Sequence, residues 1–156
     1  MKYYNEIKNK LIDNEVYKKV KDYSKNRNNL STYYAVGKLL YEAGNKYGEG
    51  IIKKYSERLV IEVGRNYNER TLRRIRQFYL VFKDEIWSTM STKLMWSHYT
   101  EILSLSNVNE INYYINITEE YNLSVRQLRE RIKNKEYQIL LKRGTKLKLP
   151  AYSIMS

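Results

Sequence analysis

Residues 69–82 read ERTLRRIRQFYLVF, and this stretch decides the fold class of the chain. Its apolar residues recur at three- and four-residue spacing, which is the period of one face of an α-helix. At about 100° per residue, one arc holds four apolar residues: Leu72, Ile75, Tyr79 and Phe82. The opposite arc holds Arg70, Arg73, Arg74 and Gln77. We therefore expect an amphipathic helix with a basic outer face.

The residues before this stretch predict how the helix begins and what precedes it. Asn68 is the expected N-cap, with Tyr67 and Leu72 at the two positions of a hydrophobic staple. A second helical pattern runs over 50–63 and ends at Gly64, a residue that commonly stops a helix. The two helices and their short connection predict a helix-turn-helix-like pair.

The same periodicity extends over most of the chain, which has only one proline and six glycines. Further helices are expected at 3–26, 30–42, 97–105, 108–121 and 125–134. Gly44 is the expected left-handed residue after the second of these, and Ser124 with Gln127 forms a capping box before the last. The predicted fold is all-α: a compact multi-helix domain over 1–137, followed by a basic tail over 138–156 that is partly disordered or a truncated linker.

The charge of the chain favours an anionic partner. Lys and Arg number 29 against 17 Asp and Glu, a formal net charge of +12. Such an excess attracts polyanions, although an AT-rich genome could also supply many of the lysines. The chain has no cysteine, no signal-peptide core at residues 1–10 and no apolar run long enough for a membrane span. We expect a cytoplasmic protein with no membrane partner.

The outer face of 69–82 is the first candidate nucleic-acid site. Arg and Gln can donate to base edges in a major groove or bind phosphates. Arg65 and Arg70 lie near the helix N-terminus, where backbone N–H groups also favour phosphate. Arg70, Arg73, Arg74 and Gln77 would thus contact nucleic acid, DNA rather than RNA. The alternative is an ordinary solvated face.

A second basic cluster lies between Arg126 and Lys148, where nine Lys or Arg face only Glu130 and Glu136. Arg126, Arg129 and Lys133 are the candidate phosphate contacts in this cluster. A charged linker is the alternative interpretation, especially after Lys142.

Aromatic residues are numerous, with 17 Tyr, 2 Trp and 2 Phe. They could stack on bases of a single strand, but we expect them mainly in the core, with the Tyr hydroxyls at its rim. His98, the only histidine, lies in the run Trp96-Ser-His-Tyr99. We expect it to pack or to cap a helix, because no cysteine or nearby acidic pair accompanies it.

No catalytic, metal or cofactor site is expected. A PD-(D/E)XK nuclease needs an Asp followed downstream by (D/E)-x-K, because carboxylates hold the metal that activates water. The only such triplet, Glu6-Ile7-Lys8, has no acidic residue before it. The turn Gly48-Glu49-Gly50 lacks the other residues of a phosphate loop.

Five motifs occur in order along the chain: Lys46 to Ile52, Tyr55 to Leu59, Arg70 to Tyr79, Leu94 to Tyr99, and Leu123 to Arg129. Together they resemble the N-terminal helical domain of YhcG-like proteins, domain of unknown function 1016, with a family-like core over 28–137. The resemblance implies a DNA-binding or interaction module that usually precedes a PD-(D/E)XK nuclease domain. Because this chain stops before that domain, we expect no enzymatic activity from it.

Two functional hypotheses therefore stay open. The first is a nucleic-acid-binding helical module that uses 69–82 as a recognition helix. The second is a phage or mobile-element interaction module or inhibitor, for example an anti-CRISPR or anti-defence protein, whose partner is a nuclease or a defence complex. Either one could act as a homodimer.

Overall fold

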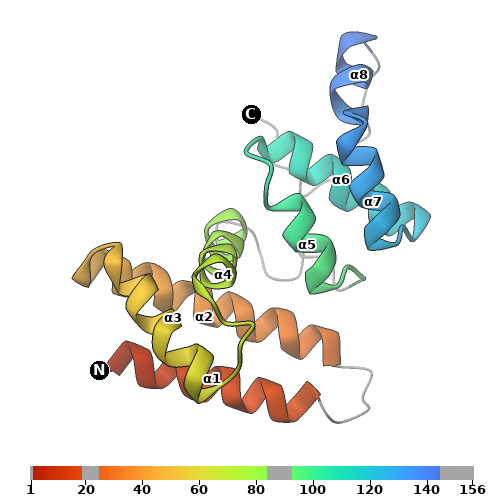
Figure 1. The fold of residues 1–156 in the computed structure, drawn as a ribbon. Helices are drawn as coiled ribbons and strands as arrows, with labels where there is room; N and C mark the ends of the chain where they lie inside the picture. The colour runs from red at the N-terminus through yellow and green to blue at the C-terminus, as the bar shows by residue number, and fades with distance from the viewer. Residues whose placement is uncertain (1, 19–24, 84–92, 145–156) are drawn as a thin grey trace. The chain divides into compact units, whose positions relative to one another are not determined.

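The computed structural model describes residues 2–18, 25–83 and 93–144, apart from the side chains of 25–27. This part of the chain contains eight helices and no strand, which confirms the all-α prediction (Figure 1). The eight helices are α1 Lys2–Lys18, α2 Lys25–Tyr47, α3 Gly50–Glu62, α4 Glu69–Phe82, α5 Trp96–Ile102, α6 Val108–Tyr121, α7 Val125–Lys133 and α8 Glu136–Lys142.

The helix boundaries agree best with prediction where an N-cap residue marks the start. α4 and α6 have the predicted bounds, and α3 and α7 each end one residue earlier than expected. The prediction for Gly44 is wrong, because α2 continues through it to Tyr47. Gly48, with φ of 92°, is the left-handed residue that follows the helix.

The helices form two compact units, residues 1–84 and 85–156, where the sequence predicts one domain over 1–137. The predicted tail also begins differently, because 136–142 form α8. Residues 145–156, the remainder of that tail, lie outside the described part of the chain. The first predicted helix was expected to continue through residues 19–24, which also lie outside the described part.

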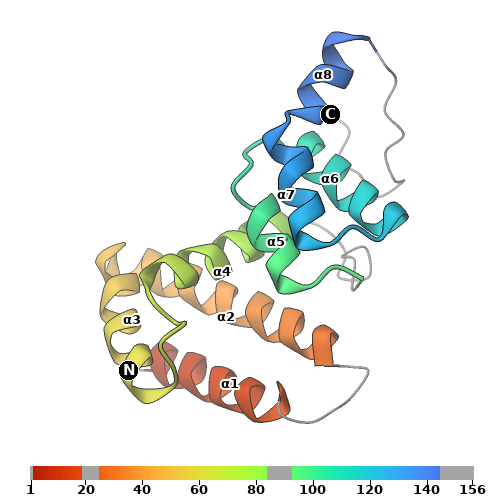
Figure 2. The same cartoon turned by 45° about the vertical axis from the view of Figure 1, so that its right-hand side comes forward.

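In the first unit, α2 lies between α1 and α4, and α3 packs against both α2 and α4 (Figure 2). The crossing of α2 and α4 is unusually close at Gly37. A Cβ built there would lie 2.5 Å from the carbonyl oxygen of Ile75 and 2.7 Å from Cβ of Tyr79. Only glycine allows this approach, which fixes where α4 sits on the unit.

In the second unit, α7 packs against α5, α6 and α8. Buried apolar side chains from all four helices form its core: Tyr99, Ile102, Ile111, Tyr114, Ile115, Leu128 and Tyr137. The one fully buried side chain of α7 is Leu128, which leaves most of that helix at the surface.

Tyrosines fill much of both cores, as predicted. Tyr4, Tyr67 and Tyr114 have no measurable exposure, yet each hydroxyl has a partner. Tyr4 and Tyr67 donate to the carboxylates of Glu62 and Glu15. Burial, together with the bond to Glu62, raises the pKa of Tyr4 to about 12. The hydroxyls are therefore tied into the packing between helices.

Within the three described segments, no helix combines the length and apolar character that crossing a bilayer requires.

Candidate nucleic-acid interface

α4 begins as the sequence predicts. Asn68 is its N-cap, and the Asn68 side chain accepts a hydrogen bond from the backbone N–H of Thr71 at 3.0 Å. Tyr67 and Leu72, the staple pair, are both buried. The buried stripe of the helix consists of Leu72, Ile75, Phe78 and Phe82. Tyr79, which was predicted to be in this stripe, is only half-buried.

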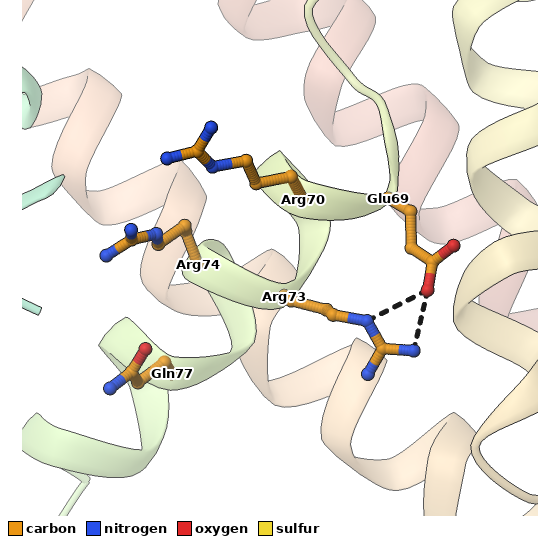
Figure 3. A pocket seen from close by; sticks show the side chains of 5 residues that line it. All are labelled: Glu69, Arg70, Arg73, Arg74 and Gln77. Atoms are coloured by element: carbon orange, nitrogen blue, oxygen red, sulfur yellow. Dashed lines mark hydrogen bonds and ion pairs between the residues drawn. The ribbon is translucent and has the colours of Figure 1, made fainter. Parts of the chain in front are cut away.

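The opposite side of α4 carries the predicted site residues. Figure 3 shows Arg70, Arg74 and Gln77 extending together from one side of the helix, while Arg73 turns toward Glu69. These five side chains line an open hollow. Arg70 is exposed and has no ion pair with the residues that the structure describes, whereas Arg74 and Gln77 are half-buried. Arg65 is exposed in the connection before α4.

Arg73 differs from its neighbours because two carboxylates bind it. It forms ion pairs with Glu69 at 2.7 Å and with Glu49 at 3.2 Å. Glu49 also binds Arg76 at 2.8 Å, and the hydrogen bond from Arg76 is the main cause that lowers the pKa of Glu49. Part of the positive charge on α4 is therefore neutralised at the junction with α3.

α7 carries the second group of predicted contacts. Arg126, Arg129 and Lys133 are exposed and, at about 100° per residue, lie within one narrow arc of the helix. Arg129 donates to Glu101 on α5 at 2.7 Å. Arg126 and Lys133 have no ion pair with any described residue. The arc is thus a cationic stripe with one of its three members paired.

The family comparison agrees with the motifs seen in the sequence. The family model for the DUF1016 N-terminal domain matches residues 7–139. This chain belongs to the DUF1016 N-terminal domain family. It is also similar to the "Putative nuclease YhcG" of Escherichia coli (strain K12), with 27% identity over 144 residues. That match covers 69% of this chain and 38% of YhcG. No solved structure matches the chain at a significant level.

In this DUF1016 N-terminal domain, the two motifs of the second unit meet at His98. Nδ1 of His98 accepts from the backbone N–H of Met95 at 3.0 Å, which caps α5. Nε2 therefore carries the proton and donates to the carbonyl oxygen of Leu123 at 2.9 Å. Both ring nitrogens are used and the side chain is only 7% exposed. His98 packs and caps, as predicted, and joins α5 to the turn before α7.

The site residues that the sequence analysis did not identify are the carboxylates that bind the arginines. Glu69 and Arg73 are four residues apart on a helix, so their pairing was readable from the sequence. Glu49 lies 24 residues from Arg73, and Glu101 lies 28 residues from Arg129. No local sequence pattern connects residues that far apart. Across the described segments, no group of three metal-ligating side chains is found.

Proposed function

We propose that this chain is a DNA-binding module that acts by binding rather than by catalysis. The observation that carries the proposal is the common direction of Arg70 and Arg74 with Gln77 on α4 (Figure 3). These groups stand on a helix whose other side is buried in the first unit, so the cationic side chains start from a rigid base. A net charge of +12 adds a long-range attraction to the same partner.

Phosphates are the groups that this face fits. Arg presents planar, forked N–H donors that pair with phosphate oxygens, and it stays charged at any pH the protein meets. Arg65, exposed before the helix, extends the cationic surface toward the N-terminus of α4. Arg73 contributes less, because DNA must compete with Glu49 and Glu69 for its guanidinium.

Arg126, Arg129 and Lys133 form the other part of the proposed interface. They lie in the second unit, on α7, and face solvent. Each unit therefore carries a cationic surface of its own that can bind phosphates.

A double variant on α4 tests the proposal. Arg70→Gln with Arg74→Gln removes two cations and keeps polar side chains of similar length. Each lost phosphate contact weakens the salt dependence of binding. The slope of log K against log salt becomes shallower by about 0.9 for each contact. We expect affinity for a duplex DNA to fall on the order of tenfold at low salt, measured by fluorescence anisotropy with the full chain.

Two lysines on α3 provide the matched control. Lys53 and Lys54 are exposed, so Lys53→Gln with Lys54→Gln removes the same charge from a neighbouring helix of the same unit. The proposal requires a clearly smaller loss for this control. Equal losses in both double variants would mean that general charge, and not the α4 face, accounts for binding.

The interaction-module hypothesis makes a different prediction. A direct protein partner recovered from a lysate with the tagged chain survives nuclease digestion, whereas material bridged by DNA does not. Capture that resists digestion, combined with no DNA binding by the purified chain, would replace the present proposal. Tighter binding to RNA than to DNA in the anisotropy experiment would correct the nature of the nucleic acid.

A further inference from the structure

The turn between α6 and α7 has the length, and at one residue the backbone conformation, that helix-turn-helix motifs use. α6 ends at Tyr121 and α7 begins at Val125, so three residues connect them. Asn122 adopts the left-handed conformation, with φ of 51° and ψ of 50°. A turn of three or four residues, commonly with a left-handed residue in it, is what the motif requires. Asn tolerates that conformation better than most other residues.

The turn is held from both sides. The backbone N–H of Leu123 donates to the carbonyl oxygen of Thr118 at 3.1 Å, and the Leu123 side chain is buried. Its own carbonyl oxygen accepts from His98 at 2.9 Å. Ser124 then begins α7 with a full capping box, in which Ser124 and Gln127 satisfy each other's backbone N–H groups. The orientation of α7 is therefore set by a turn that is hydrogen-bonded to α5 and α6.

The exposed side of α7 suits a DNA groove. The cationic stripe of Arg126, Arg129 and Lys133 occupies one arc, and Leu128 anchors the opposite side. α7 spans nine residues, enough for two turns of helix in a major groove, which admits a single α-helix. The first residues of such a helix contact the base edges, and Arg126 is in the first turn.

α4 lacks several of these features. Six residues, 63–68, separate it from α3, which is longer than the motif requires. Two carboxylates bind Arg73 near the start of α4, whereas Arg126 near the start of α7 has no ion pair with a described residue. A surface of this kind can hold phosphates, for which close insertion into a groove is unnecessary.

We infer that α7 reads base sequence in the major groove of duplex DNA, while α4 binds the phosphate backbone. This division rests on the proposed function, since it presumes that the chain binds DNA. Glu101 restrains the stripe, because its carboxylate holds Arg129 until a phosphate or a base replaces it.

Selection from a random duplex library tests the division of roles. The full chain is used to select binding sites from duplexes with a randomised centre, and the preferred sequence is compared between variants. Arg126→Lys keeps the charge but loses the forked donors that recognise guanine. We expect the preference of this variant for one base pair over the others to fall at least tenfold. Its affinity for unselected DNA should stay within about twofold of the unmodified chain. Arg131→Lys is the control, because Arg131 lies on another side of α7 and binds Glu136 at 3.5 Å.

The α4 double variant, Arg70→Gln with Arg74→Gln, completes the experiment. It is expected to weaken binding to selected and unselected duplexes by the same factor and leave the preferred sequence unchanged. A changed sequence preference in this variant, or none in Arg126→Lys, would overturn the division of roles while leaving DNA binding itself intact. Selection that yields no preferred sequence would overturn it too. If the unmodified chain binds no DNA, the proposed function fails along with it.

Discussion

Gly37 shows how much of the fold depends on a single missing side chain. The Ile75 carbonyl and the Tyr79 Cβ lie so close to it that any Cβ would clash. α4 contacts α2 at this point, and the Arg70 and Arg74 face is on the same helix. The position of the candidate site therefore depends on a glycine in a different helix.

Two glycines of α2 give opposite predictions. Gly37→Ala should lower the free energy of unfolding by about 1–3 kcal/mol, because α2 and α4 must separate to admit the methyl group. Gly44→Ala should raise it by about 0.5–1 kcal/mol, because alanine is the better helix former and the nearest atom, on Arg76, lies at a comfortable 3.6 Å. Urea denaturation of both variants measures the two changes. Stabilisation by both substitutions would show that the helices do not meet at Gly37.

Single residues were predictable where their effect is local. Asn68 and Ser124 were recognised as N-caps because a cap satisfies N–H groups two or three residues away. Gly44 was misread for the complementary reason. Glycine permits a left-handed conformation without requiring one, and tertiary contacts along α2 decide that the helix continues to Tyr47.

At the scale of the helix, the charge of α4 is set by its pairing with α3. Glu49, next to the start of α3, binds Arg73 and Arg76 together. The sequence shows the arginines but not this carboxylate, because the contact exists only once α3 and α4 pack. A count of arginines on the outer face therefore overestimates the charge that is free for a ligand.

Removal of that carboxylate should strengthen binding. Glu49→Gln frees Arg76 and leaves Arg73 paired with Glu69 alone, and we expect the affinity for duplex DNA to rise about twofold to fivefold with a steeper salt dependence. Anisotropy titrations at two salt concentrations measure both. Glu57→Gln is the control, since Glu57 is also exposed on α3 but has no ion pair with a described residue. An equal rise in the control would assign the effect to net charge alone.

Helices with apolar periodicity and a polar N-cap were predicted well, as α4 and α6 show. α8 was not predicted, because Lys135 precedes it in a left-handed conformation and the charged residues around it resemble a linker. Local sequence carries little information about such a helix, whose Tyr137 is held by packing against Tyr113.

On the scale of the whole molecule, the division into residues 1–84 and 85–156 was not predicted. Helical periodicity identifies the buried face of each helix but not which helices share a core. The family resemblance, by contrast, followed from five ordered motifs and is confirmed by the family model over 7–139. DNA binding remains a proposal, carried by the α4 face and by the stripe on α7.

The salt dependence of DNA binding by the full chain tests that proposal most directly. Arg65, Arg70, Arg74 and Lys133 together provide about four phosphate contacts, while Arg126 is assigned to a base, so log K should fall against log salt with a slope of roughly −3.6. The predicted result is a slope near that value for the unmodified chain. In the Arg70 and Arg74 double variant, the slope should become shallower by close to 2. Affinity that does not change with salt, or no measurable binding at low salt, would contradict the account.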